Sequence, residues 1–145
     1  RRHKVLQHAR RACGVYALGN HVVFEDHGHA SQRLHVASFC FVLPSVFRSE
    51  AFGMVLGEAM SYGTPVISTE LGTGTSFINQ DGKTGFVVPP ANVEALVEKI
   101  ELLHGNEGLR SELGLNAKER VAKEFNEEQM IEKTLALYEG LVARS

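Results

Sequence analysis

The stretch that decides the fold runs from Phe39 to Ser68 and reads Phe-Cys-Phe-Val-Leu-Pro-Ser-Val-Phe-Arg-Ser-Glu-Ala-Phe-Gly-Met-Val-Leu-Gly-Glu-Ala-Met-Ser-Tyr-Gly-Thr-Pro-Val-Ile-Ser. Its opening run, which ends at Leu43, is continuously apolar and is typical of a strand buried on both faces of a parallel sheet. Residues 53–62 then carry apolar side chains at helical spacing, and residues 65–68 read as the next strand. A strand, a helix and a second strand in this order are the repeating unit of a parallel α/β sheet.

The flanking sequence continues this alternation. Further elements are expected as helices over 3–13 and 30–37, strands over 21–24 and 85–88, a loop over 72–75 and a turn at Asp81-Gly82. Strands that alternate with helices and short turns are typical of a Rossmann-like, doubly wound parallel sheet. We therefore expect one α/β domain over residues 1–145, with ligands bound at the carboxyl ends of its strands.

The last third of the sequence predicts three helices. Asn92 is placed to cap the first of them, and Asn126 with Gln129 forms an asparagine variant of the capping box before the last. Each helix carries an apolar stripe, and we expect all three stripes to face the core. The stripes are Val93, Leu96, Val97, Ile100 and Leu103, then Leu109, Leu113, Ala117 and Val121, then Ile131, Leu135, Tyr138 and Val142.

The composition excludes several classes of protein. Of the 145 residues, 43% are hydrophobic and 22% are charged, as in ordinary globular domains. No apolar run approaches the roughly 18 residues that span a bilayer, and no secretory signal is visible. Cys13 and Cys40 lie among apolar residues, so we expect buried free thiols and a cytoplasmic, reducing location.

Charge is unevenly distributed along the chain. Residues 1–48 contain seven Lys and Arg against two Asp and Glu, whereas residues 92–145 contain seven against eleven. The basic front could attract a phosphate-bearing ligand or an anionic membrane surface. An equally good interpretation is that these side chains only solvate one face of the first helix.

The segment from Glu50 to Glu58 has the chemistry of a ligand site. The helix expected to begin near Gly53 would present free N–H groups and the positive end of its dipole, which suit a phosphate. Gly53 has no Cβ, so a ligand could approach its backbone closely. Glu58 lies further along the helix, and its carboxylate could accept two hydrogen bonds from the vicinal hydroxyls of a ribose. The alternative is an exposed acidic helix face behind a glycine-containing cap.

Several short motifs follow one another in a specific order. They are Pro44-Ser45, Glu50-Ala-Phe-Gly53, Glu58-Ala-Met60, Gly63-Thr-Pro-Val-Ile67, Leu71-Gly-Thr-Gly-Thr75, Asn79-Gln-Asp-Gly82 and Thr84-Gly-Phe-Val-Val-Pro89. Together they resemble the donor-binding signature of the large family of retaining glycosyltransferases that includes sucrose synthases and many bacterial mannosyl- and glucosyltransferases. The resemblance runs from about residue 20 to residue 125, and it is specific for the family but not for one substrate.

The resemblance implies a GT-B fold, in which two Rossmann-like domains face a cleft. This chain would be part of the C-terminal, nucleotide-sugar-binding domain. The family opens that domain with a strand, a Gly-Arg loop and a Lys-Gly pair whose charges neutralise the donor diphosphate, and none of these precedes Arg1. We therefore expect the first strands of the domain to be missing and the strand over 21–24 to lack a neighbour.

The resemblance also implies roles for individual residues. Glu50 would be the catalytic residue, in contact with the donor hexose near the reacting centre, and Glu58 would hold the ribose. The further donor-binding candidates are Phe52, Gly53, Met54, Val55, Ser45, Gly72, Thr73 and His29. The loop from Gly72 to Ser76 could cradle a phosphate through its N–H groups or be a plain loop. Neither a divalent metal nor another cofactor is expected.

Four histidines, His21, His27, His29 and His35, lie close together in the sequence. His27 and His29 could share a strand face and bind a metal, but no Cys or acidic residue has ligand spacing with both. Histidines on the surface or in contact with the nucleotide base are the favoured interpretation.

The expected function is transfer of a hexose, with retained anomeric configuration, from a nucleotide-sugar of the GDP-mannose or UDP-glucose type. The acceptor would be a bacterial polysaccharide or glycolipid, with possible peripheral contact at the inner face of the cell membrane and no nucleic acid partner. Transfer would need an N-terminal acceptor domain, so we expect the chain alone to be inactive. A non-catalytic nucleotide-sugar-binding or scaffold module is the alternative. A phosphorylase-like enzyme is disfavoured because Lys83 and the later lysines are badly placed to hold a cofactor.

Overall fold

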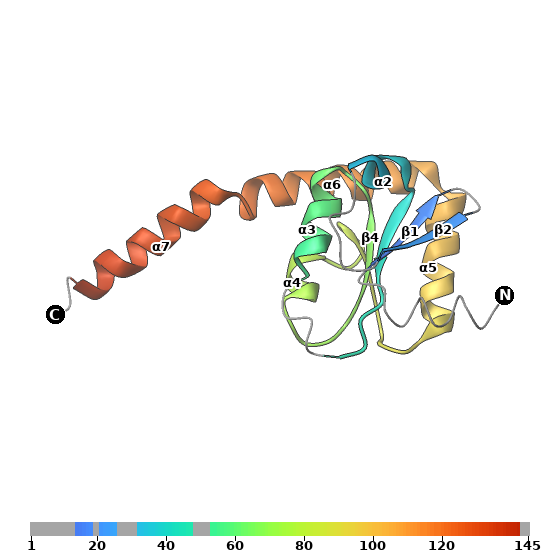
Figure 1. Cartoon of the computed structure of the whole chain (residues 1–145), viewed down its shortest axis with the longest axis horizontal. Helices are drawn as coiled ribbons and strands as arrows, with labels where there is room; N and C mark the ends of the chain where they lie inside the picture. The colour runs from blue at the N-terminus through green and yellow to red at the C-terminus, as the bar shows by residue number, and fades with distance from the viewer. Residues whose placement is uncertain (1–13, 19–20, 26–31, 48–52, 143–145) are drawn as a thin grey trace.

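The structure, a computed structural model, describes residues 14–18, 21–25, 32–47 and 53–142. These residues form a five-stranded sheet with helices packed around it, and a final helix that extends away from the rest (Figure 1).

The sheet has the order β2-β1-β3-β4-β5. Its strands are β1 (Gly14–Leu18), β2 (His21–Glu25), β3 (Cys40–Leu43), β4 (Val66–Thr69) and β5 (Gly85–Val88). β3, β4 and β5 are parallel, with Phe41 opposite Val66 and Val66 opposite Gly85. The expected parallel α/β arrangement is therefore confirmed for these three strands.

β1 and β2 differ from the expectation. The sequence pattern predicts no strand over residues 14–18 and no partner for β2, and both expectations are wrong. β1 pairs antiparallel with β2, from Gly14 opposite Glu25 to Leu18 opposite His21, and it also pairs antiparallel with β3. Only two residues separate β1 from β2, and so short a connection can join antiparallel strands, whereas parallel strands need a crossover of about a dozen residues. The sheet is therefore mixed.

The described helices are α2 (Gln32–Ala37), α3 (Met54–Ser61), α4 (Thr75–Ile78), α5 (Val93–Gly105), α6 (Glu107–Glu124) and α7 (Glu127–Val142). All except α4 lie where the apolar spacing predicts a helix. The expected loop over 72–75 ends at Gly74, because Thr75 already begins α4. With four residues, α4 is too short to show a helical period in the sequence.

The core lies on both faces of the parallel strands, because successive side chains of a strand point to opposite faces. On the face covered by α3, the buried side chains are Phe41, Leu43, Leu56, Ala59, Met60, Val66, Ile78 and Ala117. On the face covered by α5, they are Cys40, Val42, Ile67, Val88, Leu103 and Leu113. α6 contributes Leu113 to one cluster and Ala117 to the other, so it packs against both halves of the core.

The apolar stripe of α7 does not face the core. α7 has no buried residue, and its Leu135 and Tyr138 side chains are 56% and 63% exposed. The helix extends away from the sheet, and no other element of the described ranges covers it (Figure 1). The expectation of three core-facing stripes is therefore wrong for α7, and also for the exposed Val93 and Val97 of α5.

Asparagine side chains begin the last three helices. The Oδ1 atoms of Asn92 and Asn126 accept hydrogen bonds from Ala95 N at 2.9 Å and from Gln129 N at 2.8 Å, which confirms both predicted caps. Asn106 caps α6 in the same way. In the part of the chain that the structure describes, no helix has the length and apolar character needed to cross a membrane.

Candidate functional site

The candidate site lies where β3 and β4 end. Ser45 follows β3 by two residues, and the segment from Glu70 to Gly74 follows β4. Because β3 and β4 are neighbouring parallel strands, these segments meet at one end of the sheet, where ligands bind in open α/β folds. The Thr69 hydroxyl donates a hydrogen bond to the Ser45 carbonyl oxygen and joins the two segments directly.

α3 begins with a glycine in the left-handed conformation. Gly53 is the N-cap, with φ of 74° and ψ of 51°, and a residue without a Cβ adopts these angles easily. No side chain among the described residues caps this helix. The N–H groups of Met54 and Val55 lie in its first turn, where the helix itself has no carbonyl oxygen to accept their hydrogen bonds. These N–H groups, together with the helix dipole, make the start of α3 suited to an anion.

α4 begins beside α3. A Cβ on Gly53 would lie 3.3 Å from Cγ2 of Thr75, the first residue of α4. The Thr75 hydroxyl donates to the Thr69 carbonyl oxygen at 3.4 Å and lies 3.3 Å from the hydroxyl oxygen of Thr73. Thr69 and Thr75 therefore bring together Ser45, Gly53 and Thr73, three of the residues that the sequence predicts for the site.

Glu70 orders the loop between β4 and α4. Its Oε1 accepts hydrogen bonds from Gly72 N at 2.8 Å and from the Ser76 hydroxyl at 2.9 Å. The Gly72 N–H, which the sequence suggests as a phosphate ligand, is therefore bonded within the loop. Glu70 lies outside the predicted site residues, and its one signal in the sequence is an acidic residue two positions before a glycine, which is typical of a local turn.

Glu58 lies four residues after Met54, so the two side chains share one face of α3. The Glu58 side chain is 44% exposed, and its Oε1 lies 3.9 Å from Nε2 of His35. His35 is completely buried, so the expectation of a surface or base-contacting histidine is wrong for this residue. Burial lowers the pKa of His35, and the Glu58 carboxylate partly offsets this effect.

Comparison with known proteins establishes the family. The family model described as "Glycosyl transferases group 1" matches residues 8–120. The chain belongs to this family. O-antigen chain mannosyltransferase C of Escherichia coli is 45% identical to the chain over 101 residues, which are 70% of the chain and 27% of that protein. The chain spans about a quarter of the length of the curated relatives that it matches.

Solved structures share the fold of this group 1 domain. A glycosyltransferase from Rickettsia africae superposes with a TM-score of 0.72 at 27% identity, covering 83% of the chain and 32% of that structure. A TarM variant from S. aureus, solved in complex with UDP and other ligands, superposes with a TM-score of 0.65 at 26% identity, covering 74% of the chain and 21% of that structure. The expected GT-B C-terminal domain is therefore confirmed as the fold class.

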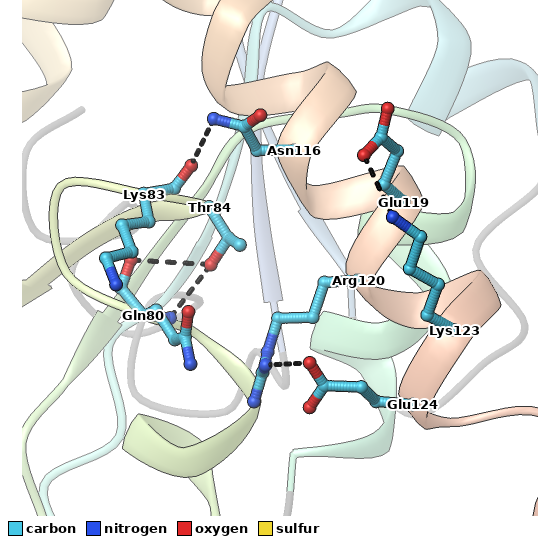
Figure 2. A pocket seen from close by; sticks show the side chains of 8 residues that line it. All are labelled: Gln80, Lys83, Thr84, Asn116, Glu119, Arg120, Lys123 and Glu124. Carbon is cyan, nitrogen blue, oxygen red and sulfur yellow. Dashed lines mark hydrogen bonds and ion pairs between the residues drawn. The ribbon is translucent and has the colours of Figure 1, made fainter.

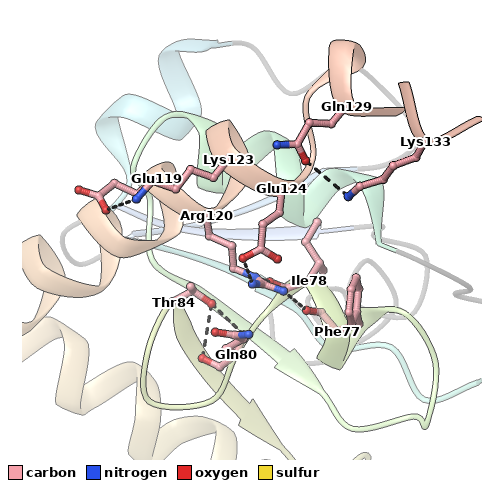
Figure 3. A network of polar contacts seen from close by, with 10 residues as sticks. All are labelled: Phe77, Ile78, Gln80, Thr84, Glu119, Arg120, Lys123, Glu124, Gln129 and Lys133. Atoms are coloured by element: carbon pink, nitrogen blue, oxygen red, sulfur yellow. Dashed lines mark hydrogen bonds and ion pairs between the residues drawn. The ribbon is translucent and has the colours of Figure 1, made fainter. Parts of the chain in front are cut away.

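Arg120 of α6 fixes α4 in the group 1 domain (Figure 3). Its guanidinium donates to the carbonyl oxygens of Ile78 at 3.1 Å and Phe77 at 2.8 Å, which lie at the end of α4. It also pairs with Glu124 at 2.6 Å. Because α4 carries Thr75 at its other end, Arg120 supports the contact between Thr75 and Gly53. The sequence gives no separate signal for Arg120.

A polar groove of the group 1 domain lies beside the start of β5, the end of the parallel strands away from Glu70 (Figure 2). It is lined by Gln80, Lys83, Thr84, Asn116, Glu119, Arg120, Lys123 and Glu124. Four of its five charged side chains are paired, Lys123 with Glu119 at 3.5 Å and Arg120 with Glu124, while no ion pair is recorded for Lys83 among the described residues. None of these described residues lies at a helix N-terminus, so the groove lacks the N–H groups of a helix start that suit an anion at α3.

Several predicted site residues lie outside the described residues, namely His27, His29, Glu50 and Phe52. Within the described ranges, no group of three or more His, Cys, Asp or Glu side chains could hold a metal ion. Cys40 is a buried free thiol as predicted, and burial raises the pKa of its thiol to about 12.

Proposed function

We propose that this chain binds the donor for a retaining hexosyltransferase, with a nucleotide-sugar of the GDP-mannose type preferred over the UDP-glucose type. The observation that supports this best is the arrangement at the ends of β3 and β4. There the start of α3, which no side chain of the described residues caps, lies beside the start of α4, and the exposed Glu58 carboxylate lies one turn away. The acceptor in the proposal is a polysaccharide or glycolipid.

The donor would lie along the start of α3. The diphosphate would accept hydrogen bonds from the N–H groups of Met54 and Val55, where Gly53 leaves room for it. One helical turn rises about 5.4 Å, so Glu58 would meet the part of the nucleotide that follows the diphosphate, which is the ribose. Ser45 and Thr73 border the same end of the sheet and would contact the sugar or the diphosphate.

The proposed chemistry separates charge between the sugar and the departing diphosphate. The sugar ring becomes positive near the anomeric carbon, and the diphosphate becomes more negative. The N–H groups at the start of α3 would stabilise the developing negative charge. Glu50 would stabilise the sugar, while Phe52, Gly72 and His29 stay candidates for the sugar, the diphosphate and the base. The proposal assigns no metal or cofactor to these steps.

The preference for a mannose-type donor follows from the relatives. The E. coli relative is named a mannosyltransferase and matches 70% of this chain at 45% identity. The TarM structure contains UDP and has lower identity to the chain. GDP is therefore the first nucleotide to test, and UDP is the second.

Ligand-observed NMR with GDP, GDP-mannose, UDP and UDP-glucose tests the proposal. The chain should bind at least one guanosine ligand, and Glu58→Ala should weaken that binding about tenfold through loss of the ribose contacts. Glu101→Ala is a matched control, because Glu101 is an exposed glutamate on α5 and should leave affinity unchanged. The proposal fails if no nucleotide binds, or if Glu58→Ala binds as tightly as the wild-type chain.

Transfer is a separate question from binding. The chain spans about a quarter of its relatives, so we expect it to bind donors without releasing sugar to an acceptor. Radiolabelled GDP-mannose with a lipid or glycan acceptor measures this directly. Turnover by the chain alone would show that the described site is sufficient for catalysis and would overturn this part of the proposal.

A further inference from the structure

His35 is held rigidly beside the proposed donor site. Its ring stacks on Tyr62 with centroids 5.2 Å apart and planes 13° apart, and it meets Phe41 edge-on at 6.2 Å. Its carbonyl oxygen accepts hydrogen bonds from the hydroxyls of Thr64 at 2.7 Å and Ser38 at 3.1 Å. Both the ring and the backbone of this residue are therefore fixed by packing and hydrogen bonding.

The side chain of Glu58, unlike that of His35, is not enclosed by packing. It lies on the exposed face of α3, and a glutamate there normally samples several rotamers, whose loss opposes ligand binding. Within the described residues, the recorded partner of its carboxylate is His35, with Nε2 and Oε1 3.9 Å apart. This distance is too long for a hydrogen bond, but an Nε2–H group on the ring would still attract the carboxylate at this separation.

The buried ring of His35 therefore lies next to the exposed carboxylate of Glu58. The ring occupies the space on the inner side of Glu58, so the carboxylate cannot turn inward there. The attraction of one oxygen by Nε2 leaves the other oxygen available to a ligand from solvent. Preorganising a binding group in this way increases affinity without adding a contact to the ligand.

We propose that His35 is a positioning residue for Glu58, which it holds in the orientation that receives the ribose hydroxyls of the donor nucleotide. This inference rests on the proposed function, because it assumes that Glu58 contacts ribose. His35 itself touches no substrate in this proposal.

The first test compares ribose with deoxyribose. GDP and 2′-deoxy-GDP are titrated into the chain and its variants. The Kd of 2′-deoxy-GDP divided by the Kd of GDP is the ratio that reports the ribose contact. His35→Phe, which keeps an aromatic ring, should lower the ratio at least about threefold toward that of Glu58→Ala. His35→Gln, which keeps an N–H donor near Nε2, should restore part of it. His104→Phe is the control, because His104 is an exposed histidine of α5.

A purely structural role for His35 predicts another pattern. His35→Phe would then weaken both nucleotides equally and leave the ratio unchanged, and that result would overturn the inference. A ratio that His35→Phe lowers and His35→Gln restores supports it.

The second test does not need a nucleotide. The pKa of His35, followed by its ring resonances in NMR, should fall in Glu58→Gln, because that change removes a charge that favours the protonated ring. An unchanged pKa would show that the two groups do not interact and would overturn the inference. If the wild-type chain binds neither GDP nor UDP, the proposed function fails, and this measurement still decides whether the contact exists.

Discussion

Gly114 of α6 packs directly against the carbonyl oxygen of Gly63, the residue that turns the chain from α3 into β4. A Cβ on Gly114 would overlap that oxygen, which belongs to the backbone and cannot move alone. The close approach of α6 to α3 therefore depends on a glycine at position 114, and it holds α3 from the end opposite to the donor site.

Gly114→Ala should destabilise the domain. The added methyl group must push α6 away from Gly63, and overpacking of this kind costs typically about 1–3 kcal/mol. Gly108→Ala in the same helix is the control, because its Cβ would meet only Asn106 Oδ1 at 3.6 Å. Urea denaturation should show a lower free energy of unfolding for Gly114→Ala and an equal or higher one for Gly108→Ala. Equal effects of the two changes would contradict the packing described.

Gly53→Ala should disturb the start of α3. Its φ of 74° costs an alanine about 1–2 kcal/mol, and the Cβ would also lie 2.9 Å from Leu56 Cδ1. Gly72→Ala separates these two effects, because Gly72 has φ of 61° but no atom within 4 Å of a Cβ. We expect Gly53→Ala to lower the Tm more than Gly72→Ala and also to weaken nucleotide binding. Similar Tm values for the two variants would argue against crowding at Gly53.

The burial of His35 should make stability depend on pH. Its pKa is lowered in the folded chain from the usual 6.5, so the unfolded chain takes up the proton first as the pH falls. The free energy of unfolding should therefore decrease as the pH falls below 6.5, until the folded chain is protonated as well. Above that pH both states are neutral at this residue, and it contributes no pH dependence.

Urea denaturation between pH 7 and pH 5 can isolate this effect through His35→Gln. The variant should lose less stability over this range than the wild-type chain, whereas His104→Gln should follow the wild type. Glu58→Gln should steepen the loss, because it removes the charge that favours protonated His35. Parallel curves for His35→Gln and the wild-type chain would contradict the burial of this residue.

Local patterns in the sequence predicted the elements that carry the site. β3, α3 and β4 follow from a continuous apolar run, a helical stripe and a second apolar run, and these signals depend only on neighbouring residues. A motif does not by itself give the role of each of its residues. Asn79 belongs to the donor-binding resemblance, yet its side chain donates to Ser68 Oγ and Phe86 O at 2.9 Å each and so ties β4 to β5.

Contacts between distant segments could not be predicted. β1 pairs with β3 although β2 and α2 lie between them in the sequence, and no local pattern in the sequence reports such a pairing. The sequence predicts the apolar face of α7, but it does not predict which element, if any, packs against that face. His35 is buried because Tyr62 and Phe41 enclose its ring, and they reach it from the end of α3 and from β3.

The donor nucleotide should bind at the carboxyl ends of β3 and β4. A titration of the ¹⁵N-labelled chain with GDP, followed by two-dimensional amide NMR, tests this placement most directly. We predict that the largest shifts occur at Gly53, Met54, Val55 and Thr73, with Glu58 next and the groove of Figure 2 unaffected. Shifts concentrated instead at Lys83, Asn116 and Lys123, at the opposite end of the parallel strands, would contradict it.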